Sequence, residues 1–307
     1  MHVLITGAAG FIGRNLLRRL TAAGHTVTGT DNFSVPPFGP VPEPIDHRDV
    51  RDLTPGDLAD ADAVVHMAAL KSVPGSFDDA AQALHNTAVD DHMLRTFAAT
   101  AGRRRLLMAS SCEVYGNQPV PCAEHHTAAP RSPYAVAKAA AEMHAVVHRG
   151  LKPALDITCL RLHNTYGADE GADAVIPRFI DTALRGEPLP LEGDGSQARD
   201  FSHIDDLVTM LERVLTDPER PPVVLNLGSG HATTIATVAR HVLTAAGLDP
   251  ADPDATVPAA ARPNEIRSFT ADMSRYTARY GPVPTRRLAD GITTVYQARA
   301  ALLSATR

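Results

Sequence analysis

The chain has 307 residues, of which 44% are hydrophobic and 21% charged, and its formal net charge is −6 at pH 7. This composition is that of a globular protein and excludes a disordered or fibrous chain. No basic run is long enough to indicate nucleic acid binding, and no apolar run is long enough to span a membrane. Three cysteines, an odd number, argue against a disulfide framework. A strand pattern begins at once and leaves no room for a signal peptide, so we expect a cytoplasmic protein.

The first half of the chain alternates short apolar runs with amphipathic helical stretches. The apolar runs predict strands at 2–6, 26–30, 63–67, 106–110 and 156–162. The amphipathic stretches predict helices at 11–23, 78–101 and 134–149, and a proline-rich loop spans 36–44. Repeated strand–helix–strand units predict a parallel sheet with helices on both faces.

The second half is less regular. Residues 165–200 read as loop with short helical stretches, followed by helices at 204–216, 233–247 and 288–303 and a strand at 223–227. We therefore predict an α/β fold, a Rossmann-type doubly wound parallel sheet with a smaller C-terminal substrate-binding lobe. The predicted division assigns 1–164 and about 200–230 to the NAD-binding domain, and 165–199 and 231–307 to the lobe.

Three glycines lie between the first predicted strand and the first predicted helix: Gly7, Gly10 and Gly13. Such a loop allows a tight turn, close approach of the backbone to a pyrophosphate, and helix packing on the strand. The helix that follows begins with Phe11 and Ile12 and would direct free N–H groups toward phosphate. Asp31 ends the second strand, where a carboxylate can accept both ribose hydroxyls of NAD and would repel the 2′-phosphate of NADP. These features predict an NAD site.

A tyrosine and a lysine, Tyr134 and Lys138, are spaced to share one helix face. A tyrosine is a poor base at neutral pH, and a nearby ammonium together with the positive nicotinamide ring would favour the phenolate by lowering the pKa of the phenol. Ser111 ends an earlier strand, at the edge of a parallel sheet where ligands bind. The three side chains together predict oxidation of a substrate hydroxyl.

These blocks together resemble the extended short-chain dehydrogenase/reductase family, in its nucleotide-sugar epimerase and dehydratase branch. The likeness extends over nearly the whole chain, in blocks at 66–69, 110–116, 161–167, 193–201, 226–230 and 262–265. It implies catalytic roles for Ser111, Tyr134 and Lys138. It implies cofactor contacts, beyond the glycine loop, Asp31 and the catalytic pair, for Asn32, Asp49, Val50, Met67, Ala68, Ala69, Lys71 and Asn86. It implies substrate contacts for Lys71, Ser111, Asn164, Val175, Arg199, Arg262 and Glu265, with the two arginines on the diphosphate.

The pair after Ser111 bears on the reaction. The 4,6-dehydratases of this family carry Asp-Glu there, whereas simple 4-epimerases carry small or neutral residues. Here the two residues are Cys112 and Glu113. Oxidation at C4 would acidify the C5 proton of the sugar, which Glu113 could then remove, while the Cys112 thiol either hydrogen-bonds the leaving C6 hydroxyl or is a small buried packing residue.

A closer likeness is to the UDP-N-acetylglucosamine 5,6-dehydratase type of tunicamycin biosynthesis, on blocks that include 71–74, 110–116, 131–134 and 262–266. It implies a UDP-sugar substrate, NAD as cofactor and an exocyclic enol ether product. The alternatives are a 4-epimerase, a 4,6-dehydratase, and a sensor or scaffold that binds NAD without turnover. We expect no metal, and a homodimer formed through the helices near 78–101 and 134–149, as is usual in this family.

Overall fold

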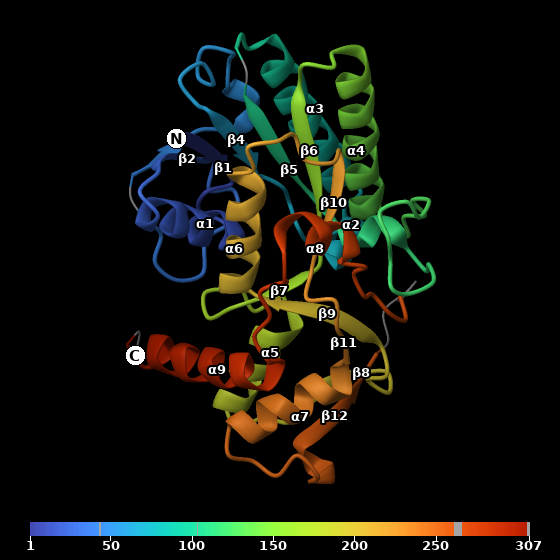
Figure 1. Cartoon of the computed structure of the whole chain (residues 1–307). Coiled ribbons are helices and arrows are strands. Elements are labelled where there is room, and N and C mark those ends of the chain that lie inside the picture. Colours follow the sequence, from blue (N-terminus) through green and yellow to red (C-terminus); the bar gives the residue numbers. More distant parts are fainter. Residues whose placement is uncertain (43, 103, 261–265, 306–307) are drawn as a thin grey trace.

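The computed structural model describes residues 1–42, 44–102, 104–260 and 266–305. Its centre is a seven-stranded sheet in the order β10-β6-β5-β4-β1-β2-β3, with every neighbouring pair parallel (Figure 1). The strands are β1 (His2–Thr6), β2 (Thr26–Asp31), β3 (Ile45–His47), β4 (Ala63–His66), β5 (Arg105–Ser111), β6 (Asp156–Leu162) and β10 (Val224–Leu227). This order confirms the predicted Rossmann-type fold.

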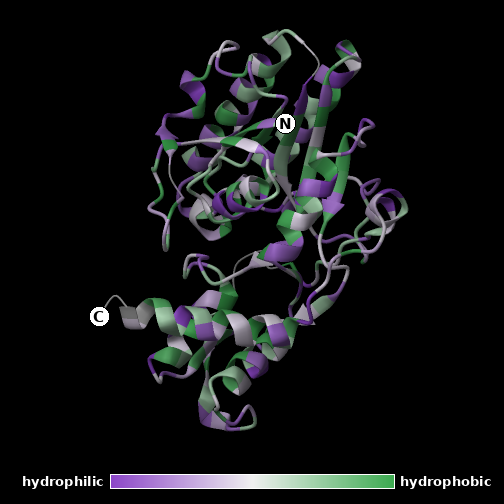
Figure 2. Ribbon diagram, turned by 60° about the vertical axis from the view of Figure 1, so that its left-hand side comes forward, coloured by the Kyte–Doolittle hydropathy of each residue, from purple (hydrophilic) through white to green (hydrophobic). Residues whose placement is uncertain are grey.

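Helices cover both faces of the sheet. On one face, α1 (Phe11–Ala22) and α6 (Ile204–Leu215) pack against each other and form a core with β1, β4, β6 and β10. On the other face, α3 (Ala81–Ala99) and α4 (Pro133–Leu151) form a second core with β4, β5 and β6. The strands between these layers are largely coloured as hydrophobic in Figure 2, as expected for a sheet buried on both sides.

A smaller lobe lies beyond the carboxyl ends of the strands (Figure 1). It contains a three-stranded sheet of β7 (Asn164–Tyr166), β9 (Ala198–His203) and β11 (Ala232–Thr234), and a pair formed by β8 (Leu189–Glu192) and β12 (Thr256–Ala259). The helices α5 (Val175–Leu184), α7 (Ile235–Ala245) and α9 (Leu288–Ala305) enclose its apolar core. One C-terminal segment, α8 (Ser274–Tyr280), packs instead on β10 of the large sheet.

Several predicted elements differ from the structure. The expected helix at 78–101 is α3, which begins at Ala81, where the Asp79 carboxylate accepts a hydrogen bond from the N–H of Ala81; the short helix α2 (Val73–Asp78) before it was not predicted. The stretch 165–200, expected to be mostly loop, holds α5, β8 and β9. Three-residue strands such as β3 and β7 were not predicted, because so short a run carries no measurable alternation.

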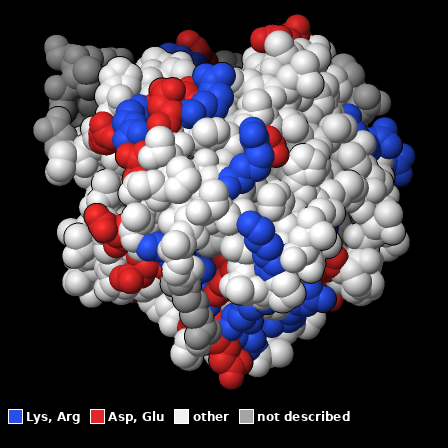
Figure 3. All heavy atoms as spheres, turned by 90° about the horizontal axis from the view of Figure 1, so that it is seen from above, with Lys and Arg blue, Asp and Glu red and all other residues white. Residues whose placement is uncertain are grey.

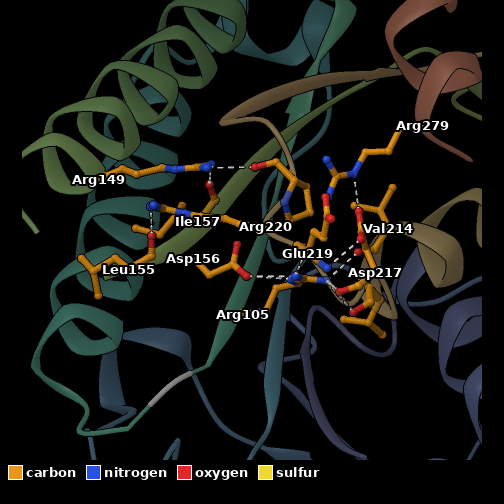
Figure 4. Close-up of polar contacts among 12 residues, drawn as sticks. Arg105, Arg149, Leu155, Asp156, Ile157, Val214, Asp217, Glu219, Arg220 and Arg279 are labelled. Atoms are coloured by element: carbon orange, nitrogen blue, oxygen red, sulfur yellow. Dashed lines mark hydrogen bonds and ion pairs between the residues drawn. The ribbon is translucent and has the colours of Figure 1, made fainter. Parts of the chain in front are cut away.

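The amino end of the sheet is tied to α6 by one buried arginine (Figure 4). Arg105, at the start of β5, contacts the Asp156 carboxylate at 2.9 Å. Its guanidinium also donates to four carbonyl oxygens just beyond α6 or in its last turn, those of Val214, Leu215, Asp217 and Glu219. These carbonyls have no partner within the helix, so Arg105 both caps α6 and joins it to the sheet.

The surface carries both signs of charge. On the face seen in Figure 3, basic and acidic side chains lie near one another and most of the surface is uncharged. None of the helices in the described part of the chain combines the length and the apolar character needed to span a bilayer.

Candidate active site

The glycine loop leaves β1 and enters α1 in a conformation that requires glycine. Gly7 has φ +68°, and a Cβ there would lie 2.6 Å from the backbone nitrogen of Ala68. A Cβ on Gly13 would lie 2.2 Å from the carbonyl oxygen of Gly7. Both distances are far below van der Waals contact, so the close packing of loop, helix and β4 depends on the missing side chains.

A cavity of about 250 Å³ opens beside this loop. Of the predicted cofactor residues it is lined by Gly7, Gly10, Phe11, Asp31, Asn32, Asp49, Val50, Met67, Ala68, Ala69 and Lys71. Ile12 packs partly buried against the α1 core, and Gly13 is buried beneath the loop. Asn86 does not line the cavity; its amide bonds both the N–H and the carbonyl of Leu70, at 2.8 and 2.9 Å, and so holds the loop that follows β4.

The acidic side chains of this cavity are held in place by local hydrogen bonds. Asp31 accepts from the N–H of Ala9 at 3.0 Å and from the N–H of Phe33 at 2.7 Å, which aims its carboxylate at the mouth of the glycine loop. Asp49 accepts from the side chain of Asn32 at 2.9 Å, and its hydrogen bond to Arg51 holds its pKa well below the usual range. The first turn of α1 contains no acidic residue. These features suit NAD, and we expect its phosphates at the helix end and a ribose at Asp31.

The predicted catalytic serine ends β5 and begins a 3₁₀ turn, η2 (Cys112–Tyr115). The Ser111 hydroxyl accepts a hydrogen bond from the N–H of Glu113 at 3.2 Å. Tyr134 lies in the first turn of α4, which is capped by Ser132 through the N–H of Ala135 at 3.1 Å. The N–H of Tyr134 donates to the Ser76 hydroxyl at 3.3 Å, so α2 also holds the start of α4.

Lys138 is buried and Tyr134 is partly buried, and both lie where charge is costly. Burial raises the pKa of Tyr134, against the opposing effects of the Lys138 charge and a hydrogen bond to Ser111. Lys138 acts in the expected direction, but desolvation outweighs it; the effect of the positive nicotinamide ring, the other part of the expectation, stays a prediction. Burial also disfavours the charge of Lys138, yet the Asp90 carboxylate outweighs it and the pKa of Lys138 lies above its ordinary value.

A second cavity, of about 640 Å³, lies between the sheet and the smaller lobe. Of the predicted substrate residues it is lined by Lys71, Asn164, Val175 and Arg199, and Glu113 also reaches it. Lys71 lines both cavities, so the two meet at its side chain. Arg262 and Glu265 lie outside the described residues. The sheet loops and the lobe together form the walls, which is where an open parallel sheet binds ligands.

Cys112 lies apart from this cavity's lining. It is 4% exposed and packs in a small cluster with Tyr115, Cys122, Ile266 and Phe269. Burial, with the nearby charge of Glu113, raises the pKa of its thiol well above the ordinary value. The thiol is therefore neutral and surrounded by apolar side chains, as a small packing residue would be.

One residue of the larger cavity, Glu170, was not predicted from the sequence. Glu170 follows β7 in a loop and is 6% exposed, and its Oε2 has no hydrogen-bond partner in the structure. Its Oε1 lies 3.9 Å from Lys71 Nζ. Burial raises the pKa of Glu170 to about 8, although Lys71 opposes the shift. A single acid in a loop matches no motif, so only the fold reveals that it is buried in the cavity wall.

Comparison with known proteins identifies the family of the chain. Residues 3–228 match the model of the NAD dependent epimerase/dehydratase family, well over half of the chain. The chain belongs to this family. It is therefore an enzyme of the nucleotide-sugar epimerase and dehydratase class with NAD as its cofactor, in agreement with the glycine loop, Asp31 and the Ser111–Tyr134–Lys138 group.

Curated relatives of this epimerase/dehydratase catalyse more than one reaction. The chain is 31% identical over 309 residues to a dTDP-glucose 4,6-dehydratase of Streptomyces griseus, covering 95% of the chain and 92% of the relative. It is 32% identical over 308 residues to a UDP-glucose 4-epimerase of Mycolicibacterium smegmatis, covering 95% and 96%. Identity of this size therefore does not separate dehydration from epimerisation.

Solved structures of similar proteins agree over almost the full length. The NDP-hexosamine 5,6-dehydratase TunA of tunicamycin biosynthesis has a TM-score of 0.91 and 34% identity, covering 98% of both chains. MoeE5 in complex with UDP-glucuronic acid and NAD has a TM-score of 0.88 and 30% identity, covering 98% of this chain and 100% of its own. This agreement confirms the likeness to the 5,6-dehydratase type noted from sequence.

Proposed function

We propose that this enzyme is a 5,6-dehydratase of UDP-N-acetylglucosamine. It oxidises C4 of the sugar, eliminates water across C5 and C6, and returns the hydrogen to C4, leaving an exocyclic enol ether. The observation that carries the proposal is Glu113, a carboxylate that reaches the substrate cavity from the turn that Ser111 begins. A 4-epimerase has no need of a base at this place, because it removes no carbon-bound proton at C5. The similarity to TunA and to a UDP-sugar complex of MoeE5 supports both the reaction and the nucleotide.

In this mechanism each residue has a separate task. Ser111 holds the C4 hydroxyl, and Tyr134, as phenolate, takes its proton while Lys138 stabilises the negative phenolate. NAD, which the glycine loop and Asp31 would hold, would supply the hydride acceptor for the C4 hydrogen and the donor for its return. The ketone at C4 acidifies the neighbouring C5 proton, which Glu113 removes.

The elimination needs a proton for the departing C6 oxygen. Glu113, protonated in the preceding step, gives that proton to the C6 hydroxyl, which leaves as water while the C5–C6 double bond forms. Tyr134 then returns its proton to the C4 oxygen. The elimination therefore needs no further acid. This agrees with a Cys112 thiol that is neutral and packed in an apolar cluster.

Mass spectrometry of the product tests the proposal. With UDP-N-acetylglucosamine the enzyme should yield a product lighter by one water, and Tyr134→Phe should yield none while remaining folded. Glu113→Gln should block loss of water but still show transient NADH absorbance, since C4 oxidation precedes the step at C5. Glu187→Gln, which neutralises a half-exposed carboxylate paired with Arg185, is the matched control and should keep full activity.

Three results would overturn the proposal. An unchanged mass with inverted configuration at C4 would identify a 4-epimerase. Loss of water with a methyl group at C6 and a ketone at C4 would identify a 4,6-dehydratase. NAD binding without turnover on any UDP- or dTDP-sugar would leave a sensor or scaffold.

We also propose that two copies of the enzyme associate through α3 and α4. These helices pack side by side (Figure 1), and their outer faces carry apolar side chains that are each more than half exposed. Four of these lie in one stripe along α4, and the fifth is on α3: Val136, Met143, Val147, Leu151 and Leu84. An apolar stripe of this kind in a water-exposed position favours association.

Light scattering coupled to gel filtration tests this association. The enzyme should elute as a dimer, and Met143→Glu should shift it toward the monomer. Val257→Glu, an equal change at an exposed residue on the smaller lobe, should leave the dimer intact. A monomeric wild-type enzyme at micromolar concentration would refute the proposed interface.

A further inference from the structure

A chain of buried polar side chains connects the glycine loop to the catalytic lysine. Thr6, the residue before Gly7, pairs its hydroxyl with His66 Nδ1 at 2.7 Å. His66 Nε2 lies 3.0 Å from Asp90 Oδ1, and Asp90 Oδ2 lies 3.3 Å from Lys138 Nζ. The four residues come from β1, β4, α3 and α4, and each is at most 2% exposed.

The chemistry of this series of hydrogen-bonded side chains determines where its protons lie. An ionised carboxylate only accepts hydrogen bonds, so the His66 ring carries its proton on Nε2 and donates to Asp90. On the other side of the ring, Nδ1 shares a hydrogen bond with the Thr6 hydroxyl. Every member has a partner, and Asp90 has one on each oxygen. A carboxylate bound on both sides cannot turn, so the direction in which it holds Lys138 is determined.

The surroundings of Lys138 show why a fixed counter-charge matters. An ammonium buried without a partner would lose its proton rather than remain charged. The other titratable groups that face Lys138 are Tyr134, on the same helix, and the Cys159 thiol on β6, whose pKa burial raises far above its usual range. Tyr134 is the proposed reacting group and Cys159 is neutral. Asp90 is thus the anion that keeps Lys138 charged.

We propose that Asp90 is a positioning residue of the catalytic pair, which holds the Lys138 ammonium charged and directed toward Tyr134, and that His66 and Thr6 hold Asp90. This inference rests on the proposed roles of Tyr134 and Lys138 in oxidising the sugar. It makes the end of the glycine-loop strand and the catalytic helix parts of one hydrogen-bonded unit.

The chain offers a direct measurement of the Lys138 charge. It contains three lysines, Lys71, Lys138 and Lys152, and the other two extend to the surface. Protein labelled with ¹³C at the lysine ε carbon will therefore give three NMR signals, which Lys71→Arg and Lys152→Arg assign. The signal of Lys138 in the wild type should remain that of the ammonium up to high pH. In Asp90→Asn, which keeps the shape and removes the charge, its titration midpoint should fall by about two pH units or more.

A matched variant separates this effect from general damage to the fold. Glu142 is also a buried carboxylate, one helical turn beyond Lys138 on α4, but it pairs with Arg161 at 2.7 Å. Glu142→Gln should lower thermal stability without moving the Lys138 titration. An unchanged titration in Asp90→Asn, or an equal shift in Glu142→Gln, would overturn the proposal. If Asp90→Asn fails to fold, Asp90→Ser leaves room for a water and serves in its place.

The pH profile of sugar oxidation provides the second measurement. The profile should rise as Tyr134 ionises and fall as Lys138 loses its proton. Asp90→Asn should lower kcat by roughly tenfold or more with little change in KM, and should move the alkaline limb to lower pH. A purely structural role would lower activity at every pH and leave both limbs in place. Because the NMR titration needs no turnover, it decides the role of Asp90 even if the proposed sugar substrate is wrong.

Discussion

The Ser111 hydroxyl accepts a hydrogen bond from the N–H of Glu113 at 3.2 Å, so the residue proposed to hold the substrate oxygen and the proposed base belong to one turn. Ser111→Ala removes this acceptor and also the hydrogen bond to Tyr134. We expect its kcat to fall about 100-fold, within the range of acid–base partners. Ser111→Thr keeps the hydroxyl and should retain most activity. Steady-state kinetics with both variants checks this, and equal losses would show that the hydroxyl is not required.

Gly13→Ala should weaken NAD binding. The new Cβ would lie 2.2 Å from the Gly7 carbonyl oxygen, which belongs to the backbone of the loop and cannot move without opening the turn. Gly150→Ala is the matched control, because a Cβ there meets nothing within 4 Å. Calorimetric titration with NAD should show normal affinity for the control and at least a tenfold weaker affinity for Gly13→Ala, about 1.4 kcal/mol or more. Equal affinities would show that the glycine packing is not needed for the cofactor.

Glu170→Gln should change how stability depends on pH. Burial raises the pKa of Glu170 from an ordinary 4.5 to about 8, so the unfolded chain ionises this group well before the folded protein does. The wild type should therefore lose stability as pH rises from 4.5 to 8, by at most about 1.4 kcal/mol per pH unit from this residue. Glutamine cannot ionise, so the variant does not lose stability in this way. Urea unfolding at pH 5 and pH 8 should show that the variant becomes more stable relative to the wild type at the higher pH. An equal change in the free energy of unfolding of both proteins would mean that Glu170 is ionised in the fold.

Arg105→Met should destabilise the enzyme by about 3 kcal/mol or more, because it leaves the Asp156 carboxylate buried without its partner and four carbonyls at the end of α6 uncapped. Arg185→Met removes a half-exposed arginine paired with Glu187 and should cost less than about 1 kcal/mol. Urea unfolding of both variants at pH 7 gives the comparison. Similar small losses would show that the network in Figure 4 contributes little.

The sequence predicts best what is local in the chain. The glycine loop is recognisable because strand, turn and helix follow one another within a few residues, and Tyr134 and Lys138 because one helical turn separates them. The strands of the smaller lobe were missed because most have only three or four residues and depend on pairing with distant segments. The helix α2 was missed because it has only six residues, too few for a clear helical pattern.

Composition and motif therefore determined the Rossmann-type sheet, the NAD cofactor and the class of chemistry. Only the tertiary structure decided how the side chains of the candidate site are surrounded: Asp90 next to Lys138, Cys112 in an apolar cluster, and Glu170 buried in the cavity wall. A helix pattern is a property of neighbouring residues, and so the sequence carries it directly. A pKa depends on burial and on charges brought from distant parts of the chain, and these exist only once the chain has folded.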